Sequence, residues 1–518
     1  MNVIKQKNEL YTKLDSICDE LRKTMDPSEY RNYILGFIFY KYLSEKFVNA
    51  ADLELKNDNK KYLELDENDD LKKELDNELA NNLGYFIKKE FLFQTWVEKI
   101  KNNEMVLSLI ETSLKELEKS SYGTNSEDQF KDLFSDINIA SSKLGNSENA
   151  KNKTISHVIL KLSEISFSYD DAQIDILGDA YEHLIANFAK SAGKKAGEFY
   201  TPQEVSKILA KIVTSKNKKL KNAYDPTCGS GSLLLQIAEN AEVGVLYGQE
   251  IKDTTFNLAR MNMFLRGKQF HEFNIKNDDT IMNPAHLHDD NGNQLKFDVI
   301  VANPPFSLPW DAPEKMMSDP RFSEYGKLAP KSKMDYAFIQ HMLYQLSDNG
   351  IMATVVPHGV LFRGAAEETI RTYIIKNRNW LDAVIGLPSN IFYGTSIPSC
   401  IMVFRKDRKP DDSILFIEAS REFEKGKNQN ILSEENINKI IDTYINRTEI
   451  EKYSRNVQLS EIVENEYNLN ITRYVDTFED EEEIDIKAVN EELKKINEEI
   501  AKTEKEIEEM VSELVETR

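Results

Sequence analysis

NAYDPTCGSGSLLLQIAENAEVGVLYGQE, residues 222–250, has the pattern from which the fold class is inferred. Two short runs with apolar residues, 222–225 and 244–250, flank a segment of helical period at 232–241. A strand, a helix and a second strand in succession are the unit of a parallel sheet with helices on its faces. The first strand meets its helix at a turn with two glycines, where the backbone can approach a ligand closely.

The same alternation of strand and helix continues to about residue 420. The expected strands are 222–225, 244–250, a third ending in 274–281, and 297–303, 350–357, 381–388 and 399–405; the expected helices are 232–241, 254–267, 334–346 and 366–376. This order predicts an α/β fold with a doubly wound, Rossmann-like parallel sheet. Such sheets bind ligands outside the carboxyl ends of their strands.

The segments on either side of this region are helical. Residues 1–165 show amphipathic helical spacing, and no proline occurs between Pro27 and Pro202. Near the C-terminus, apolar residues are spaced alternately by three and four, which is the a/d seam of a coiled coil. The seam consists of Ile486, Val489, Leu493, Ile496, Ile500, Thr503, Ile507, Met510 and Leu514. It either packs on its own domain or docks on another chain, and we favour docking.

These patterns divide the chain into four expected parts. They are an all-helical N-terminal domain at 1–165, an α/β domain at 166–420, an extension at 421–475 and an acidic helical tail at 476–518. The tail holds 17 acidic and 6 basic residues, so it supplies −11 of the net charge of −22.

Three cysteines, Cys18, Cys228 and Cys400, lie far apart in the sequence. They indicate neither a disulfide framework nor a zinc cluster with close ligand spacing, and we expect no metal. No apolar run approaches the roughly 18 residues that would span a membrane. The opening stretch MNVIKQKNEL lacks the apolar core of a signal peptide. We therefore expect a cytoplasmic protein with no membrane contact.

The turn after the first strand is the first candidate for ligand binding. Its candidate residues are Asp225, Gly229, Ser230, Gly231 and Ser232. Glu250 ends the next expected strand, where a carboxylate accepts hydrogen bonds from ribose hydroxyls. The loop is not GxGxxG and has no pyrophosphate to hold, so S-adenosylmethionine suits it better than a dinucleotide. Asp279, or with less support Asp278, is placed to accept from the cofactor's adenine amine, although an acidic turn explains both equally well.

The second candidate is the turn Asn303-Pro304-Pro305-Phe306, directly after the apolar strand FDVIVA. The prolines fix the backbone and remove two donors. The Asn303 side-chain oxygen and the Pro304 carbonyl are then two acceptors for the two N–H groups of an exocyclic amine, which leaves the lone pair of that amine free to attack a methyl sulfonium. Phe306 offers a face for an extruded base, since a duplex hides the amine until the base is flipped out. A structural turn is the simpler reading of this motif alone.

A weaker third candidate lies just before the first strand, in GEFYTPQ. Aromatic residues there are expected to pack on the cofactor or base, and the threonine to donate to the methionine carboxylate. The candidate contacts are Glu198, Phe199, Tyr200, Thr201, Pro202 and Gln203.

The order EFYTP, DPTCGSGS, GQEI and NPPF resembles the amino-methyltransferases in which the cofactor motif precedes the catalytic one. More narrowly, MDPSEYRNYILGFIFYKYLSEKF, PKSKMDYAFIQHML, GIMATVVPHGVLFRG and GLPSNIFYGTSIPSCIMVFRK resemble the modification (methyltransferase) subunits of type I restriction–modification systems. The resemblance covers nearly all of the chain to about residue 420. It implies S-adenosylmethionine-dependent methylation of adenine N6 in double-stranded DNA by base flipping, with the cofactor contacts at 198–203, 229–232 and Glu250 and the catalytic motif at 303–306.

The resemblance also implies partners: a DNA-specificity subunit, often with two methyltransferase copies per specificity chain, and a restriction–translocase subunit. The acidic net charge agrees with this, because it indicates that a partner supplies much of the grip on DNA. The short region after Ser420 agrees as well, because it leaves little room for a target-recognition domain. No P-loop motif GxxxxGK[ST] is present, so translocation is expected elsewhere. The alternatives are N4-cytosine methylation, methylation of protein glutamine, and a non-catalytic structural subunit. The intact Asn303, Glu250 and glycine loop argue against the structural subunit.

Overall fold

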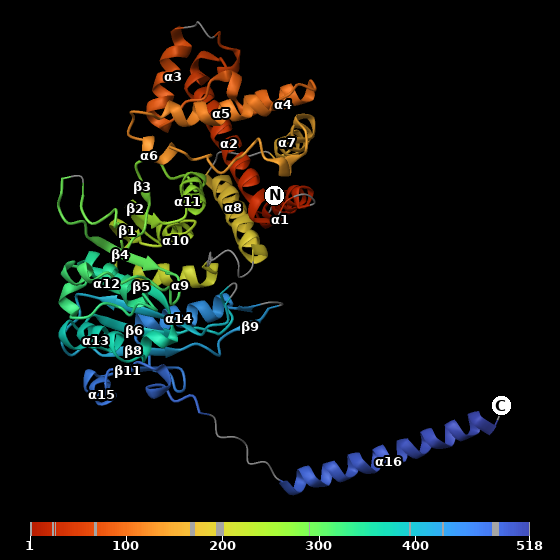
Figure 1. Cartoon of the computed structure of the whole chain (residues 1–518), viewed down its shortest axis with the longest axis vertical. Coiled ribbons are helices and arrows are strands. Elements are labelled where there is room, and N and C mark those ends of the chain that lie inside the picture. The colour runs from red at the N-terminus through yellow and green to blue at the C-terminus, as the bar shows by residue number, and fades with distance from the viewer. Residues whose placement is uncertain are drawn as a thin grey trace. The chain divides into compact units, whose positions relative to one another are not determined.

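The computed structural model describes residues 3–22, 25, 27–66, 70–165, 171–192, 201–289, 291–392, 395–426, 429–478 and 486–516. The chain forms two units, Met1–Val475 and Asp476–Arg518. Figure 1 shows a helical region in the first unit, followed along the chain by the sheet and its flanking helices.

The regular elements of the N-terminal region are all helices among its described residues, as the sequence predicts. Its helices are α1 (Val3–Leu21), α2 (Pro27–Glu54), α3 (Asp70–Leu83), α4 (Phe93–Lys101), α5 (Leu107–Ser120), α6 (Glu127–Phe130), α7 (Glu148–Ser163) and α8 (Asp171–Ala192). Most of α2 is buried, because its apolar and aromatic side chains surround the helix and meet neighbours on several sides.

The helical region is packed firmly on the α/β region through α11 (Asp253–Leu265). The Tyr42 hydroxyl donates to the Phe264 carbonyl at 3.0 Å. The buried Arg260 donates to the carbonyls of Asp128 at 3.0 Å and Lys131 at 2.8 Å. One hydrophobic core runs through both regions, so they act as one support for whatever lies on the sheet.

The sheet has nine strands in the order β11-β8-β6-β7-β5-β4-β1-β2-β3. Their bounds are β1 Lys219–Asp225, β2 Glu242–Glu250, β3 Phe273–Asn277, β4 Phe297–Ala302, β5 Leu346–Pro357, β6 Leu381–Gly386, β7 Ser399–Arg405, β8 Ile414–Glu418 and β11 Ser454–Val457. Helices α9 (Gln203–Val213), α10 (Ser232–Asn240), α12 (Asp335–Gln345), α13 (Ala366–Thr372) and α14 (Glu434–Asn446) lie among them.

The sheet is mixed rather than parallel, which corrects the expected pattern. β7 is antiparallel to both β5 and β6, and β11 is antiparallel to β8. The described part of the connection from Gly386 to Ser399 contains no helix that would carry the chain across the sheet. A return without such a crossover is antiparallel.

The order of the strands reverses between β1 and β4, which are parallel neighbours. From β1 the chain proceeds to β2 and β3 on one side, and from β4 to β5 on the other. The carboxyl ends of β1 and β4 therefore lie side by side at a topological switch point. Alternate β4 side chains enter two cores, with Val299 and Val301 on one face and Ile300 and Ala302 on the other.

The second unit contains α16 (Ile486–Glu516), a helix of 31 residues that includes all nine positions of the expected seam. Where exposure is described, the seam side chains from Val489 to Met510 are about half exposed. None of the described helices has the length and apolar character to cross a membrane.

Candidate cofactor and catalytic site

The glycine turn follows β1 and opens α10. Gly229 and Gly231 both have positive φ, 54° and 78°, which disfavours side chains other than hydrogen. They differ in their surroundings. A Cβ on Gly231 would lie 2.8 Å from the Met263 Cε, whereas a Cβ on Gly229 would meet no atom within 4 Å. A side chain at position 231 would therefore clash with Met263, whereas Gly229 leaves its backbone exposed to open space at the edge of the sheet.

Glu250 lies at the end of β2 and holds this turn in place. Its Oε2 accepts from the Gly229 N–H at 3.1 Å, and its Oε1 accepts from the Lys252 N–H at 2.9 Å. Each carboxylate oxygen has lone-pair capacity for more than one donor. Glu250 therefore shapes the loop and still offers acceptor capacity next to it.

Asp225 is the last residue of β1 and is 2% exposed. Its Oδ1 accepts from the Thr227 N–H at 2.9 Å. Burial raises the pKa of the Asp225 carboxyl to about 7; the bond from Thr227 opposes this rise, and the nearby Glu250 charge adds to it. The site thus holds a carboxyl that changes charge near neutral pH.

The turn after β3 contains Asp278 and Asp279. The Asp279 Oδ1 accepts from the N–H groups of Ile281 at 2.8 Å and Met282 at 2.9 Å, so the side chain caps the turn. Asp279 is half-buried and Asp278 is exposed, which favours Asp279 as the residue that faces a ligand. Ile251, directly after Glu250, is 61% exposed at the neighbouring strand end. Sequence reasoning missed Ile251, whose signal is an apolar residue directly after the strand carboxylate.

Asn303 follows β4, next to the end of β1. Its Nδ2 donates to the Thr201 Oγ1 at 3.0 Å. Its Oδ1 is buried and accepts no hydrogen bond within the described residues. A buried acceptor without a donor is costly in an isolated protein and commonly marks a place where a ligand completes the bonding.

The Phe306 end of the Asn-Pro-Pro-Phe turn contacts residues from other parts of the chain. Phe306 contacts Phe392 edge to face, with ring centroids 5.9 Å apart. The next residue, Ser307, has a φ of 51°, and its N–H donates to the buried Asp335 at 2.8 Å. Arg363 donates to the same carboxylate at 3.1 Å. Asp335 and Arg363, which sequence reasoning missed, therefore fix the backbone directly after the Asn-Pro-Pro-Phe turn.

The segment before β1 is partly described. Glu198, Phe199 and Tyr200 lie outside the described residues. Thr201 and Pro202 lead into α9, which places the Thr201 hydroxyl on Asn303. Gln203 is exposed, and its amide donates to Glu182 at 3.3 Å rather than to the glycine turn.

A buried polar chain ties the long loop after Asn303 to the sheet. Arg321 donates to the His341 Nδ1 at 3.1 Å, and the other ring nitrogen of His341 is 3.1 Å from the Tyr224 hydroxyl. Burial, with the Arg321 charge, holds the pKa of His341 well below its ordinary value. The neutral ring accepts from Arg321 at Nδ1, so its Nε2–H donates to Tyr224.

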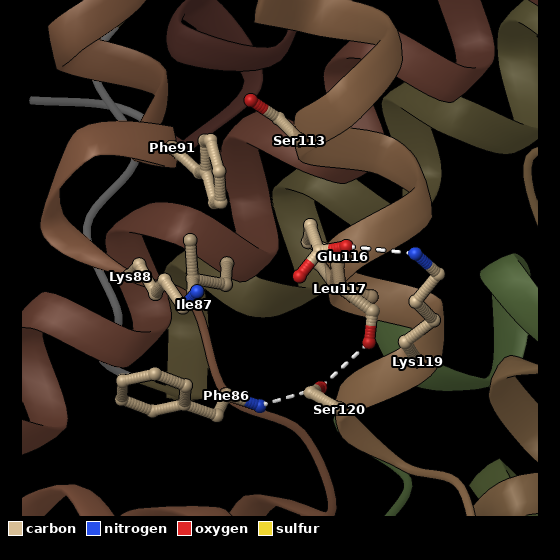
Figure 2. Close-up of a pocket in the computed structure, with 9 residues that line it drawn as sticks. All are labelled: Phe86, Ile87, Lys88, Phe91, Ser113, Glu116, Leu117, Lys119 and Ser120. Carbon is tan, nitrogen blue, oxygen red and sulfur yellow. Dashed lines mark hydrogen bonds and ion pairs between the residues drawn. The ribbon is translucent and has the colours of Figure 1, made fainter.

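A cavity in the helical region lies apart from this site. A cavity of about 200 Å³ lies between Lys88, Phe91 and α5 of the helical region, and Figure 2 shows its lining. The polar groups there bond to one another, with Glu116 2.9 Å from Lys119 and the Phe86 N–H 2.9 Å from the Ser120 Oγ. Among the described residues no group of three His, Cys, Asp or Glu could hold a metal ion, and the three cysteines are free and buried.

The glycine turn after β1, the carboxylate after β2 and the Asn-Pro-Pro-Phe turn after β4 meet at one edge of a mixed α/β sheet. Together they define the class of the α/β methyltransferases.

Comparison with known proteins narrows the class. The N-6 DNA Methylase family matches residues 172–483, and the HsdM N-terminal domain matches residues 10–162. The chain is 38% identical to the methylase subunit of the type I restriction enzyme MpnII from Mycoplasma pneumoniae, over 94% of this chain and 92% of the relative. It thus belongs to the N-6 DNA methylases and, among them, to the methylase subunits of type I restriction enzymes, and it is a DNA methyltransferase.

Solved structures agree with this assignment. The type I restriction–modification methyltransferase subunit from Streptococcus thermophilus has a TM-score of 0.83 and 40% identity, over 91% of this chain and 100% of that one. A modification subunit of a type I enzyme from Vibrio vulnificus has a TM-score of 0.62 over 91% of this chain and 97% of that one; at 18% identity it shows the shared fold alone.

Proposed function

We propose that this subunit transfers a methyl group from S-adenosylmethionine to the N6 amine of adenine in double-stranded DNA. The observation that carries the proposal is the buried Asn303 Oδ1, which accepts no hydrogen bond within the described residues and lies next to the glycine turn. An amine that donates one N–H to this oxygen and the other to the Pro304 carbonyl has both acceptors it needs.

The residues on the β1 and β2 side fit the cofactor. The open space above Gly229 admits a ligand against bare backbone. Glu250 has acceptor capacity for ribose hydroxyls, Ile251 offers an apolar surface for the adenine ring, and Asp279 has an Oδ2 that accepts from no described residue. S-adenosylmethionine, when bound, supplies an electrophilic methyl group. Asp225 then sits beside a ligand of net positive charge.

The residues on the β4 side act on the target base. Asn303 and the Pro304 carbonyl hold both amine hydrogens and so orient the nitrogen lone pair. The Thr201 hydroxyl fixes the Asn303 amide, and its own hydrogen is free to donate to the carboxylate of the cofactor. Phe306, braced by Phe392, offers a stacking face for the base. Because the amine is inaccessible in a duplex, this arrangement requires base flipping.

The test is Asn303→Ala. We expect methyl transfer to fall by at least about 100-fold, since an acceptor that orients the reacting group in the transition state is lost. Cofactor affinity, measured by calorimetry, should change less than about twofold. Asn102→Ala, an exposed asparagine of the helical region, is the matched control. Transfer by Asn303→Ala at the rate of the control would refute the assignment.

We further propose that the subunit works within a complex that contains a DNA-specificity subunit, with two methyltransferase copies for each specificity chain, and that a restriction–translocase subunit joins it. The half-exposed apolar stripe of α16 supports docking on another chain's helix, because a lone helix cannot bury such a stripe.

The test of docking is the double substitution Leu493→Glu with Ile500→Glu. It places two charges in the seam, and we expect loss of the complex in sizing chromatography. The control, Glu492→Lys with Glu499→Lys, changes neighbouring polar positions and should keep the complex. Assembly of the seam variant at control level would contradict docking through α16.

A further inference from the structure

Exposed apolar side chains gather at the edge of the sheet that carries the Asn-Pro-Pro-Phe turn. Ile251 and Met282 follow β2 and β3, on the side assigned to the cofactor. Leu308 and Phe362 follow β4 and β5, and Ile397 precedes β7. β7 runs antiparallel to β5, so its start lies at this same edge, where Pro357 pairs with Ser399. The last three side chains therefore form an apolar rim on the target side of the switch point.

Phe362 is the aromatic member of the rim and is 47% exposed. It follows η8 (His358–Leu361), whose Val360 and Leu361 are fully buried. The buried Arg371 donates to the Val360 carbonyl at 3.2 Å and to the Arg363 carbonyl at 3.0 Å. The backbone is thus fixed on both sides of Phe362, while about half of the residue stays exposed.

Arg363, the residue after Phe362, is hydrogen-bonded to the residues that hold the Asn-Pro-Pro-Phe turn. Arg363 donates to Asp335 at 3.1 Å, to Glu367 at 2.9 Å and to the Ser307 Oγ at 3.4 Å. Asp335 in turn accepts from the Ser307 N–H, directly after Phe306. The exposed ring is therefore held in a set relation to the turn that would receive the base.

Two lysines lie beside the rim. The Leu308 carbonyl accepts from the Met334 N–H at 2.9 Å, and the Trp310 N–H donates to the Lys331 carbonyl at 2.8 Å, so Lys331 and Lys333 run next to Leu308. Neither lysine forms an ion pair within the described residues. Lysines at such a surface suit phosphates, which position a duplex. An apolar rim with such lysines therefore fits duplex DNA as its occupant.

We propose that Phe362 is the wedge that enters the base stack as the target base leaves it. This inference rests on the proposed function. Extrusion leaves a gap whose neighbouring bases have lost a stacking partner, and an inserted apolar side chain restores contact there. A ring on a rigid mount fills the gap without the loss of mobility that a flexible side chain would undergo.

The test compares two unmethylated duplexes that contain the target site. One is fully paired, and the other has an abasic position opposite the target adenine. The enzyme is the full chain with its specificity protein. We expect Phe362→Ala to lower the rate on the paired duplex at least tenfold and on the abasic duplex less than threefold, because the second duplex resists extrusion less. Phe362→Trp should stay within threefold of wild type on both. Tyr122→Ala, an exposed aromatic of the helical region, is the control.

A second readout uses 2-aminopurine at the target position, whose fluorescence rises on extrusion. We expect the rise with wild type and its loss with Phe362→Ala. Wild-type rates on both duplexes, equal losses on both, or failure of Phe362→Ala to bind the specificity protein would each overturn the wedge. The proposed function is judged separately by the base that the wild type methylates. A cytosine product would refute adenine specificity while the ratio of rates still tests the wedge, and no transfer to either duplex would overturn both.

Discussion

Asp225 gives the site a pH dependence that the structure predicts in sign and size. Its carboxyl is buried at the end of β1, and burial moves its pKa from 3.8 to about 7. That difference corresponds to about 4 kcal/mol in favour of the neutral form. Asp225 is therefore mostly protonated at pH 6 and mostly ionised at pH 8.

A cofactor with net positive charge favours the ionised carboxylate. If binding requires ionised Asp225, apparent affinity follows the ionised fraction, which rises about eightfold between pH 6 and pH 7.5 for a pKa of about 7. We expect calorimetric titrations with S-adenosylmethionine to show this rise. Asp225→Asn keeps the acceptor for the Thr227 N–H but cannot ionise, so its affinity should be lower and flat over the same range.

The same substitution should alter stability. Because the folded pKa is above the unfolded one, wild type loses stability relative to Asp225→Asn as the pH rises from about 4 to about 7, by up to about 4 kcal/mol. Urea unfolding of both proteins at pH 5 and pH 7.5 measures this difference. Equal slopes of affinity against pH in the two proteins, or a difference in stability that does not grow with pH, would show that the Asp225 carboxyl does not titrate near neutral pH.

Substitutions at four further positions test neighbouring parts of the site. Thr201→Val removes the hydroxyl that accepts from the Asn303 amide, and kcat should fall about tenfold, which is the effect of one lost hydrogen bond. Thr201→Ser retains the hydroxyl and should retain kcat. Methylation assays quenched at fixed times measure both. Gly229→Ala should lower the free energy of unfolding by about 1 kcal/mol and weaken cofactor binding, which calorimetry measures. Gly231→Ala should lower thermal stability, because its Cβ would meet Met263, and melting curves measure this loss. Asp335→Asn should weaken the Arg363 contact and lower kcat more than cofactor affinity, and an unchanged kcat would show that Ser307 is held without the ion pair.

The strands that carry the site could be predicted because each is a short apolar run between turn residues. β1, β2, β4, β6 and β7 lie close to their expected positions. The parallel direction expected from the alternation of strands and helices is confirmed for β1 to β5. The direction of β7 could not be predicted, since an apolar run has the same composition whichever way it crosses the sheet. The antiparallel β7 and the additional strands β8 and β11 became apparent only from the pairing.

The candidate site divides in the same way. Residues within one motif, such as Gly229 and Asn303, could be proposed because the motif is local in sequence. The supports of the motif could not, because Asp335 and Arg363 are 28 and 56 residues from Ser307. Asp335 carries one signal that could have been used, since it begins an otherwise apolar helix in which a charge needs a partner. The bond from Thr201 to Asn303 spans 102 residues and has no sequence signal.

The most direct test of the central claim is the transfer of tritiated methyl groups from S-adenosylmethionine to duplex DNA that contains the target site. The full chain is assayed with and without its specificity protein, and the DNA is then digested to nucleosides. We expect label in N6-methyladenine when both proteins are present, and little label or label without site preference from this chain alone. Label in N4-methylcytosine, or on protein instead of DNA, would contradict it.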